Sequence, residues 1–519
     1  MPLRLSGLVS GMDTESIVSE LMKAQKFKST RIENKITKLE WSQEKWKALN
    51  TKIYSFYTGT LSKMRLQGTF DTKLASSSSE GKVTLTAAGS APEGTHTLKI
   101  MQMASAQYVT GAKLGNDLTG KAITADTKLV DLGFTAGTGN TVTIDAGDGP
   151  ETLTVSDTTT VGDFTGTLRK AGLNASFDTV QDRYFISSKE SGYANAFSIS
   201  TAGVMDLSLL GLSTVTKTDN GDGTVSVSGG SNITLVGPKD SKIEYNGAEI
   251  VSSTNSVTVN GLTLTLKGLT AGATTPDPLD DEVLNLTVSN NTQAVYDTIK
   301  DFVKKYNELN KEMNDAYSAV SARGYDPLTD EEKDTMSESQ VDKWETRIKD
   351  SLLRRDETIS SLLSSMRTIL NESVEIDGKD YSLSTFGISS ANYTEKGLLH
   401  IYGDTDDSIT SGREDKLMKA LTEDPDKVKE VFNELAGNLY EKMTEDMSST
   451  PLRSALTFYN DKEMAKTITN HQSELKKIEG KLADMEERYY KQFAALESAM
   501  AKMNSQSSSL MSMLGINQQ

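Results

Sequence analysis

Residues 468–510 read ITNHQSELKKIEGKLADMEERYYKQFAALESAMAKMNSQSSSL and carry an apolar side chain at every seventh position. The row consists of Ile468, Leu475, Leu482, Tyr489, Leu496, Met503 and Leu510. A 3.5-residue repeat sustained over so many turns is typical of a coiled-coil seam. At 1.5 Å per residue the stretch predicts a helix about 65 Å long. A single stripe of that length cannot bury itself, so the helix needs a partner.

The N-terminal part of the chain carries a similar apolar row, made of Ile32, Leu39, Trp46 and Ile53. Asp13 is placed to cap the start of this helix, and Glu15 suits its first turn. One interpretation is two surface helices packed on a core. The other is a rod, in which the terminal helices pair with each other, with neighbouring copies, or with both. Heptads at both ends of one chain favour the rod.

The middle of the chain, from about residue 76 to 290, alternates apolar and polar residues between turn signals. Asn260-Gly261 and Asn246-Gly247 each predict a two-residue β-hairpin. A third hairpin, turning at Gly147-Asp148-Gly149, is expected to pair Val142 and Ile144 with Leu153 and Val155. This region is therefore expected to be mostly antiparallel β.

Helical patterns return near Gln293. The capping box Thr329–Glu332 predicts the start of a helix that carries Trp344, Ile348 and Leu352. Asp424-Pro425 predicts another helix start, since proline is favoured at the first helical position.

These patterns predict a multidomain α+β chain with terminal coiled-coil helices, a helical stalk domain, and antiparallel β-rich head domains inserted between the stalk halves. The expected segments are an N-terminal coiled coil (1–40), the first stalk part (41–75), head domain 1 (76–107 and 236–290), an inserted β-rich head domain 2 (108–235), the helical second stalk part (291–459) and a C-terminal coiled coil (460–519).

The composition and charge of the chain exclude some classes of binding partner. The 519 residues have a net charge of −17, which argues against nucleic acid. Residues 1–66 carry twelve Lys and Arg against six Asp and Glu, whereas residues 108–290 carry eleven against twenty-one. No apolar run approaches membrane-spanning length, and the N-terminus lacks the apolar core of a Sec signal peptide. The absence of cysteine suits a chain exported unfolded.

The sequence offers no candidate for catalysis, a cofactor or a metal. Its three histidines, His96, His400 and His471, fall in separate expected elements. The stretch Asp219–Gly223 resembles a calcium loop but lacks carboxylates at its fifth and twelfth positions, so it predicts a hairpin turn. An enzyme domain carried on a scaffold therefore has no site to support it.

Several short motifs resemble one family. The opening Gly7-Leu8-Val9-Ser10-Gly11-Met12-Asp13 is the first, with Gly7, Leu8, Ser10, Gly11 and Asp13 as its motif positions. The others are Phe302-Val303 with Tyr306-Asn307, the stretch 383–388, Asp424-Pro425 with Val428, Val431 and Phe432, and Gln492-Phe493 followed by Leu510. Together they resemble the flagellar hook-associated protein 2 family, the filament cap proteins. The resemblance covers about 1–100 and 240–515, and 160–200 is similar to a repeat of flagellar head domains.

The chain departs from the family pattern in two places. Arg355-Asp356 stands where members usually carry Gly-Asp, and the acidic segment Asp326–Asp350 is longer than in many members.

The resemblance implies a structural protein at the distal end of the bacterial flagellum. It implies export through the flagellar type III apparatus and a ring of identical subunits that helps exported flagellin fold and insert. Flagellin, the hook–filament junction proteins and an export chaperone on the C-terminal helix are the implied partners, and the heptad rows are the implied assembly contacts. The alternative is a secreted adhesin with a β-rich head on a coiled-coil stalk.

Overall fold

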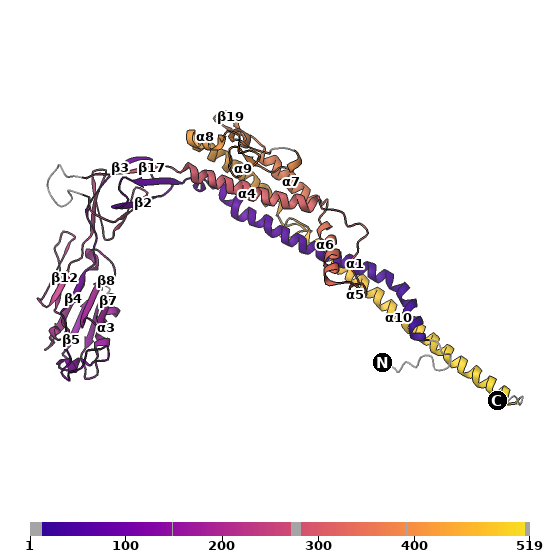
Figure 1. The fold of residues 1–519 in the computed structure, drawn as a ribbon, viewed down its shortest axis with the longest axis horizontal. Helices are drawn as coiled ribbons and strands as arrows, with labels where there is room; N and C mark the ends of the chain where they lie inside the picture. Colours follow the sequence, from indigo (N-terminus) through magenta and orange to yellow (C-terminus); the bar gives the residue numbers. More distant parts are fainter. Residues whose placement is uncertain (1–12, 148, 271–281, 391–392, 514–519) are drawn as a thin grey trace. The chain divides into compact units, whose positions relative to one another are not determined.

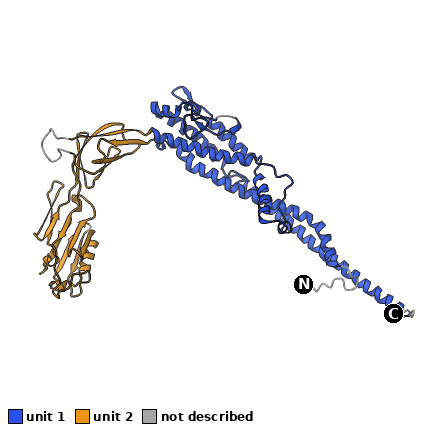
Figure 2. Ribbon diagram, in the orientation of Figure 1, with its two compact units in different colours: residues 1–70, 292–519 blue, residues 71–291 orange. Residues whose placement is uncertain are grey.

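The computed structural model describes residues 13–147, 149–270, 282–390 and 393–513. The chain divides into two compact units, coloured separately in Figure 2. We call Met1–Phe70 with Thr292–Gln519 the stalk unit, and Asp71–Asn291 the head unit. The β-rich head is thus inserted between two helical parts of the sequence, which confirms the predicted fold class.

The stalk unit is mainly helical (Figure 1). Its helices are α1 (Thr14–Ser55), the π-helix η1 (Phe56–Leu61), α2 (Ser62–Met64), α4 (Thr292–Tyr317), α5 (Asp330–Asp334), α6 (Glu338–Ser351), α7 (Glu357–Leu370), α8 (Lys416–Glu423), α9 (Pro425–Asp446) and α10 (Asp461–Met513). Short 3₁₀ turns lie at Gln67–Thr69, Leu383–Phe386 and Tyr393–Glu395. Two small antiparallel pairs complete it, β18 (Val374–Ile376) with β19 (Lys379–Tyr381) and β20 (Ile388–Ser389) with β21 (His400–Ile401).

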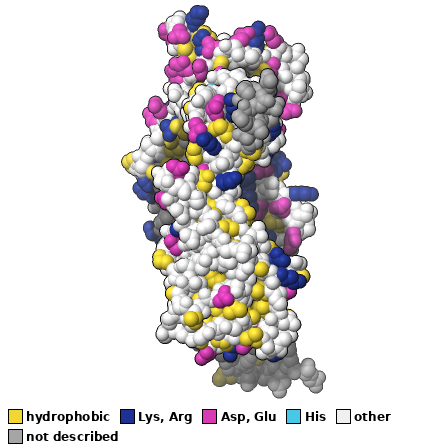
Figure 3. All heavy atoms as spheres, turned by 90° about the vertical axis from the view of Figure 1, so that its left-hand side faces the viewer, with side chains coloured by type: hydrophobic (Ala, Val, Ile, Leu, Met, Phe, Trp, Pro, Cys, Tyr) yellow, Lys and Arg dark blue, Asp and Glu magenta, His cyan; other side chains and the backbone are white. Residues whose placement is uncertain are grey.

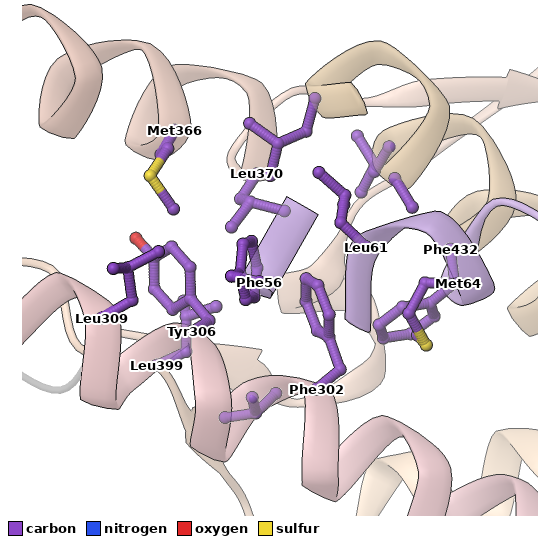
Figure 4. Packing of buried hydrophobic residues seen from close by; sticks show 14 of the residues in the cluster. Phe56, Leu61, Met64, Phe302, Tyr306, Leu309, Met366, Leu370, Leu399 and Phe432 are labelled. Carbon is purple, nitrogen blue, oxygen red and sulfur yellow. The ribbon is translucent and has the colours of Figure 1, made fainter. Parts of the chain in front are cut away.

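The core of the stalk unit forms where α4 meets the end of α1, η1, α7 and α9 (Figure 4). The face of α4 buries Val295, Ile299, Phe302, Val303, Tyr306 and Leu309, which recur at the 3.6-residue period of a helix and confirm the helical pattern expected from about Gln293. The Phe302 ring lies 6.0 Å from that of Phe56 and 6.5 Å from that of Phe432. Because burying such a side chain contributes roughly 1.5–3 kcal/mol, this packing rather than helix propensity holds the helices.

The head unit contains two β modules with separate cores. In the first, a five-stranded antiparallel sheet lies with a three-stranded one around the buried side chains of Leu98, Ile243 and Leu264. The larger sheet has the order β1 (Lys73–Ser77), β17 (Leu284–Asn290), β3 (Gly94–Gln102), β13 (Ser241–Tyr245) and β14 (Ala248–Ser252). The smaller one has the order β15 (Ser256–Val259), β16 (Leu262–Leu266) and β2 (Val83–Ala87).

The second module has a five-stranded and a four-stranded antiparallel sheet and one helix, α3 (Val161–Lys170). The first sheet has the order β11 (Val225–Gly229), β10 (Val215–Asp219), β9 (Ser198–Ala202), β5 (Thr141–Asp145) and β6 (Pro150–Thr154). The second has the order β12 (Ile233–Val236), β4 (Tyr108–Gly111), β8 (Arg183–Ser188) and β7 (Leu173–Asp178). Short 3₁₀ turns lie at Leu129–Leu132, Tyr193–Asn195 and Leu207–Leu210.

The surface of the head unit is poor in charge over much of the face turned to the viewer in Figure 3, where uncharged polar side chains and backbone predominate. Small hydrophobic patches interrupt it. This surface agrees with the Thr-, Ser- and Gly-rich sequence of the region.

The predicted hairpin turns are present. Asn260 and Gly261 have φ angles of 50° and 77°, and Val259 pairs with Leu262 across the turn. Asn246-Gly247 joins β13 to β14 in the same way. In the third hairpin the turn residue Asp148 lies outside the described residues; Val142 pairs with Leu153 as expected, but Ile144 pairs with Glu151, and the last pair before the turn is Asp145 with Pro150.

One helix prediction was wrong. Thr329 and Glu332 do form a capping box, but the helix they open is the single turn α5. The helix that carries Trp344 and Ile348 is α6, which begins at its own box, where the backbone N–H of Ser337 donates to Gln340 Oε1 at 2.9 Å. A second capping signal three residues after the first turn ends thus divides the expected helix in two.

The finer segment boundaries stay predictions, although the structure shows where they fall. The boundary at 40/41 lies inside α1, the one at 75/76 inside β1, and the one at 235/236 inside β12. The boundary at 459/460 lies just before α10. An uninterrupted helix or strand thus crosses three of them.

Candidate assembly surface

The two terminal helices pair within one chain. α1 enters the stalk core through its C-terminal end, whereas α10 leaves it from its N-terminal end, so they run in opposite directions along each other (Figure 1). Their contact is a separate small apolar cluster. It consists of buried Ile32, Ile36 and Ile468, with Leu39, Met464, Leu475 and Ile478 packed against it. Of the partners left open by the sequence, the structure contains the intramolecular one.

The apolar row of α1 contacts α10 along its N-terminal part and the stalk core along its C-terminal part. Ile32 and Leu39 pack in the cluster with α10. Trp46 and Ile53 lie in the stalk core, where the Trp46 ring stacks on Tyr459 at 5.3 Å. A single heptad row therefore continues from a two-helix rod into a globular core.

The apolar row of α10 is buried at its start and exposed towards its C-terminal end. Ile468 is buried, and the next three positions, Leu475, Leu482 and Tyr489, are half-buried. The last three are exposed, Leu496 at 44%, Met503 at 63% and Leu510 at 59%. Met511 and Met513 near them are exposed as well. We call Leu496, Met503, Leu510, Met511 and Met513 the distal face.

Apolar side chains near the start of α1 are also exposed to solvent. Ile17 and Leu21 are partly exposed, and Phe27 is 73% exposed. Asp13 caps the helix as predicted, because its Oδ1 accepts a hydrogen bond from the backbone N–H of Ser16 at 3.0 Å. The other motif positions, Gly7, Leu8, Ser10 and Gly11, lie outside the described residues.

Sequence reasoning missed Phe27, Met511 and Met513 as members of exposed apolar surface. Phe27 stands off the heptad row, between Lys26 and Lys28. An aromatic residue flanked by lysines on a helix indicates exposure, so this signal was available in the sequence. Met511 and Met513 lie beyond or beside the last heptad position and had no comparable pattern.

The motif Tyr306-Asn307 anchors a loop within the stalk unit. The Asn307 side chain donates to the carbonyl of Leu399 at 2.7 Å and accepts from the N–H of Leu399 at 2.8 Å. The Tyr306 hydroxyl donates to the carbonyl of Gly397 at 3.3 Å, and burial raises the pKa of Tyr306 to about 12. These residues therefore support the fold and do not form an exposed site.

Charged groups gather beside the same loop. Lys300 of α4 bridges Asp404 and Asp406 at 2.6 and 2.7 Å, and these hydrogen bonds raise the pKa of Lys300 above its usual value. His400 lies between Asp407 and Glu395, with ring nitrogen to carboxylate distances of 2.5 and 3.0 Å. The ion pairs of Lys300 tie the loop to α4, and the contacts of His400 tie the loop to itself, so both clusters have a structural role.

Among the residues that the structure describes, no group of three or more His, Cys, Asp or Glu side chains is arranged to hold a metal ion. None of the helices in the described ranges is both long and apolar enough to cross a membrane.

Comparison with known proteins extends over nearly the whole chain. The family model for the flagellar hook-associated protein 2 N-terminus matches residues 10–107, and the model for the C-terminus matches residues 238–505. The flagellar hook-associated protein 2 of Halalkalibacterium halodurans is 26% identical, over 98% of this chain and 99% of that protein. That of Escherichia coli strain K12 is 24% identical, over 97% and 96%.

Among solved structures, the D1-D2-D3 domains of the flagellar cap protein FliD from Escherichia coli match with a TM-score of 0.52 at 19% identity. The match covers 79% of this chain and 96% of that one, and it shows the likeness of the fold. The comparisons do not support the adhesin alternative. The chain belongs to the flagellar hook-associated protein 2 family, the filament cap proteins of the bacterial flagellum.

Proposed function

We propose that this chain caps the distal end of the flagellar filament as a ring of identical subunits. There it promotes the folding and insertion of exported flagellin and prevents its loss to the medium. The role is structural rather than catalytic. The observation that carries this proposal is the distal face, an apolar row on a helix of 53 residues that is exposed in the single chain.

The distal face suits a contact made between molecules. An apolar side chain contributes roughly 1.5–3 kcal/mol when fully buried, but only if a facing helix supplies the hole. In α10 the side chain of Ile468 is already buried against α1, whereas those of Leu496, Met503 and Leu510 are exposed and could still be buried by another molecule. Helix packing into a groove of neighbouring subunits or of the filament end would bury them.

The polar seam positions fit a cap that must move as the filament grows. Gln492 and Gln506 each follow a residue of the apolar row, Tyr489 and Met503, by three positions, so they belong to the second row of the seam, and both are exposed on α10. Polar seam residues lower the stability of a coiled coil while setting its register. A contact of this kind is specific in position and still reversible.

We also propose the finer partners and route that family membership suggests. The chain reaches the outside of the cell through the flagellar type III apparatus. On the way, an export chaperone binds the C-terminal helix and covers its apolar row. The hook–filament junction proteins are its neighbours before the filament grows.

Images of filament tips test the proposal. Purified full-length chain is added to filaments from a strain that lacks its cap protein, and the tips are examined by negative-stain electron microscopy. A plate of density on tips only after addition is the expected result. Tips that stay bare while the protein binds along filament sides would contradict it. Native mass spectrometry of the same preparation gives the number of subunits in the ring.

A further inference from the structure

The methionines of this chain differ sharply in exposure. The sequence has 19, of which Met1 and Met12 lie outside the described residues. Among the other seventeen, only three are exposed, Met503 at 63%, Met511 at 52% and Met513 at 89%. The remaining fourteen are buried or half-buried, down to 0% for Met313 and Met443 in the stalk core.

These three methionines lie in the distal face. At about 100° of rotation per residue, Met503, Leu510, Met511 and Met513 fall within roughly 160° of the helix circumference. Met503 therefore lies on the apolar row that the proposed function uses, and Met511 and Met513 flank that row on its two sides, within the same half of the α10 surface. Leu496, two turns before Met503, continues that side.

An exposed thioether reacts with two-electron oxidants such as hydrogen peroxide or hypochlorous acid. With peroxide the sulfur lone pair attacks one oxygen, an S–O bond forms, the O–O bond breaks and water leaves. The sulfur is oxidised and the peroxide is reduced. Exposure governs which methionines react, and no thiol competes within these 519 residues because they contain no cysteine.

The product, methionine sulfoxide, differs from methionine in polarity. A sulfoxide is polar, so its burial against a facing helix carries a desolvation cost where the thioether had a gain. Three such changes on one face remove much of its apolar character. Buried methionines in the stalk core stay protected, so the fold of the chain is expected to survive.

We propose that Met503, Met511 and Met513 form an oxidation-sensitive site that switches the distal face off. Peroxide or hypochlorous acid converts them to sulfoxides, and the oxidised subunit no longer docks through that face. The inference rests on the proposed function, because the switch acts on the contact that function requires. Once docked, the face is covered and its methionines are protected.

The test begins with the full-length wild-type chain treated with hydrogen peroxide. Peptide mapping by mass spectrometry should find these three methionines oxidised on the order of tenfold faster than the half-buried ones. Binding to filament tips should fall on the order of tenfold after treatment. Methionine sulfoxide reductases A and B together should restore it. Even oxidation of all methionines, or unchanged tip binding after complete oxidation of the three, would overturn the proposal.

A matched pair of variants separates this site from general oxidation. Met503→Leu/Met511→Leu/Met513→Leu removes the sulfur from the face, so the ratio of its tip binding after peroxide to its own binding before treatment should stay near one. Met205→Leu/Met336→Leu/Met418→Leu removes three half-buried methionines elsewhere and should stay sensitive. Equal sensitivity of the two variants would refute the switch. If untreated wild-type chain fails to bind tips, the proposed function itself fails. If it binds equally with and without oxidation, only the switch fails.

Discussion

Arg355 adopts a backbone conformation that favours glycine. Its φ angle is 56°, and its N–H donates to the carbonyl of Tyr317 at 2.9 Å. The following residue, Asp356, caps α7 by accepting from the N–H groups of Thr358 and Ile359. The resemblance to the family leads us to expect Gly-Asp at this position. Arg355 therefore keeps the turn although it is not glycine. Its left-handed backbone lowers the stability of the stalk unit by about 1–2 kcal/mol.

Arg355→Gly is expected to stabilise the stalk unit by about 0.5–1 kcal/mol, because relief of the left-handed strain exceeds the greater chain entropy of glycine. The measurement is the midpoint of the stalk transition in thermal unfolding. Arg354→Gly is the control, since residue 354 is not among the described residues with positive φ, and it should lower the midpoint. A lower midpoint for Arg355→Gly would contradict the assignment of strain.

Tyr306 gives the stalk unit a dependence on alkaline pH. Burial raises its pKa from 10.0 to about 12, so folding favours the protonated phenol. That contribution is fully present below pH 10 and is lost as the pH rises through about 12. Its size is about 2–3 kcal/mol for a shift of two units. Urea unfolding of the stalk at pH 9 and pH 12 should show a smaller loss for Tyr306→Phe than for wild type. Tyr108→Phe, half exposed in the head unit, should match wild type.

Hairpins and periodic helices are the elements that the sequence predicted well, because each follows from local chemistry. Asn260-Gly261 meets the need for two positive φ angles, and the spacing of Phe302 and Tyr306 matches the helical period. The π-helix η1 was not predicted. Phe56 and Leu61 are both buried although five residues apart, and only the wider π turn brings such positions to one face.

Two turn glycines have nearly the same backbone conformation but different surroundings. Alanine substitutions at them therefore distinguish the cost of backbone strain from the cost of a close contact. Gly261 and Gly247 have φ angles of 77° and 82°. A Cβ at Gly261 would lie 3.0 Å from the Cα of Ala91, whereas one at Gly247 meets nothing within 4 Å. Gly247→Ala should cost the head unit about 1–2 kcal/mol from strain alone. Gly261→Ala should cost more, measured by chemical unfolding of the full chain followed by head-unit signals. Equal costs would show that the Ala91 contact relaxes freely.

The sequence predicted which residues of α10 form the apolar row, but it did not predict which of them α1 covers. Heptad spacing identifies Ile468 and Leu496 as equivalent positions. Burial of the first at 8% and exposure of the second at 44% depend on how far α1 accompanies α10, and no local pattern encodes that. The same limit explains why the expected boundary at 40/41 has no break in α1.

At the scale of the whole molecule, the second head module encloses its own core. All its buried apolar residues lie between Val109 and Val215, with Ile233 and Leu235 packed against them. The predicted domain 108–235 nevertheless leaves out Gln107, which is fully buried. Its amide donates to the carbonyl of Phe197 at 3.0 Å and accepts from the N–H of Phe197 at 2.8 Å.

We predict that the fragment 108–235 folds alone and that 107–236 is more stable by about 1–3 kcal/mol, because Gln107 satisfies buried backbone groups. Chemical unfolding of the two fragments measures the difference. In the longer fragment, Gln107→Ala should remove most of this difference, because it deletes the amide that pairs with Phe197 and keeps only the backbone bonds of residue 107 to Ser188. A fragment 107–236 with a collapsed amide NMR spectrum would contradict the autonomy of this module.

The central claim is that the distal face of α10 is the contact by which this chain caps a filament. The most direct test is complementation of a capless strain with Leu496→Glu/Met503→Glu/Leu510→Glu, measuring swimming and flagellin released to the medium. Val180→Glu/Val320→Glu is the matched control, since both valines are exposed at 79% and 78% outside α10. The account predicts that the control restores swimming, whereas the distal-face variant leaves flagellin in the medium even where its own exported amount, measured alongside, matches that of the control. Normal filaments from the distal-face variant would contradict it.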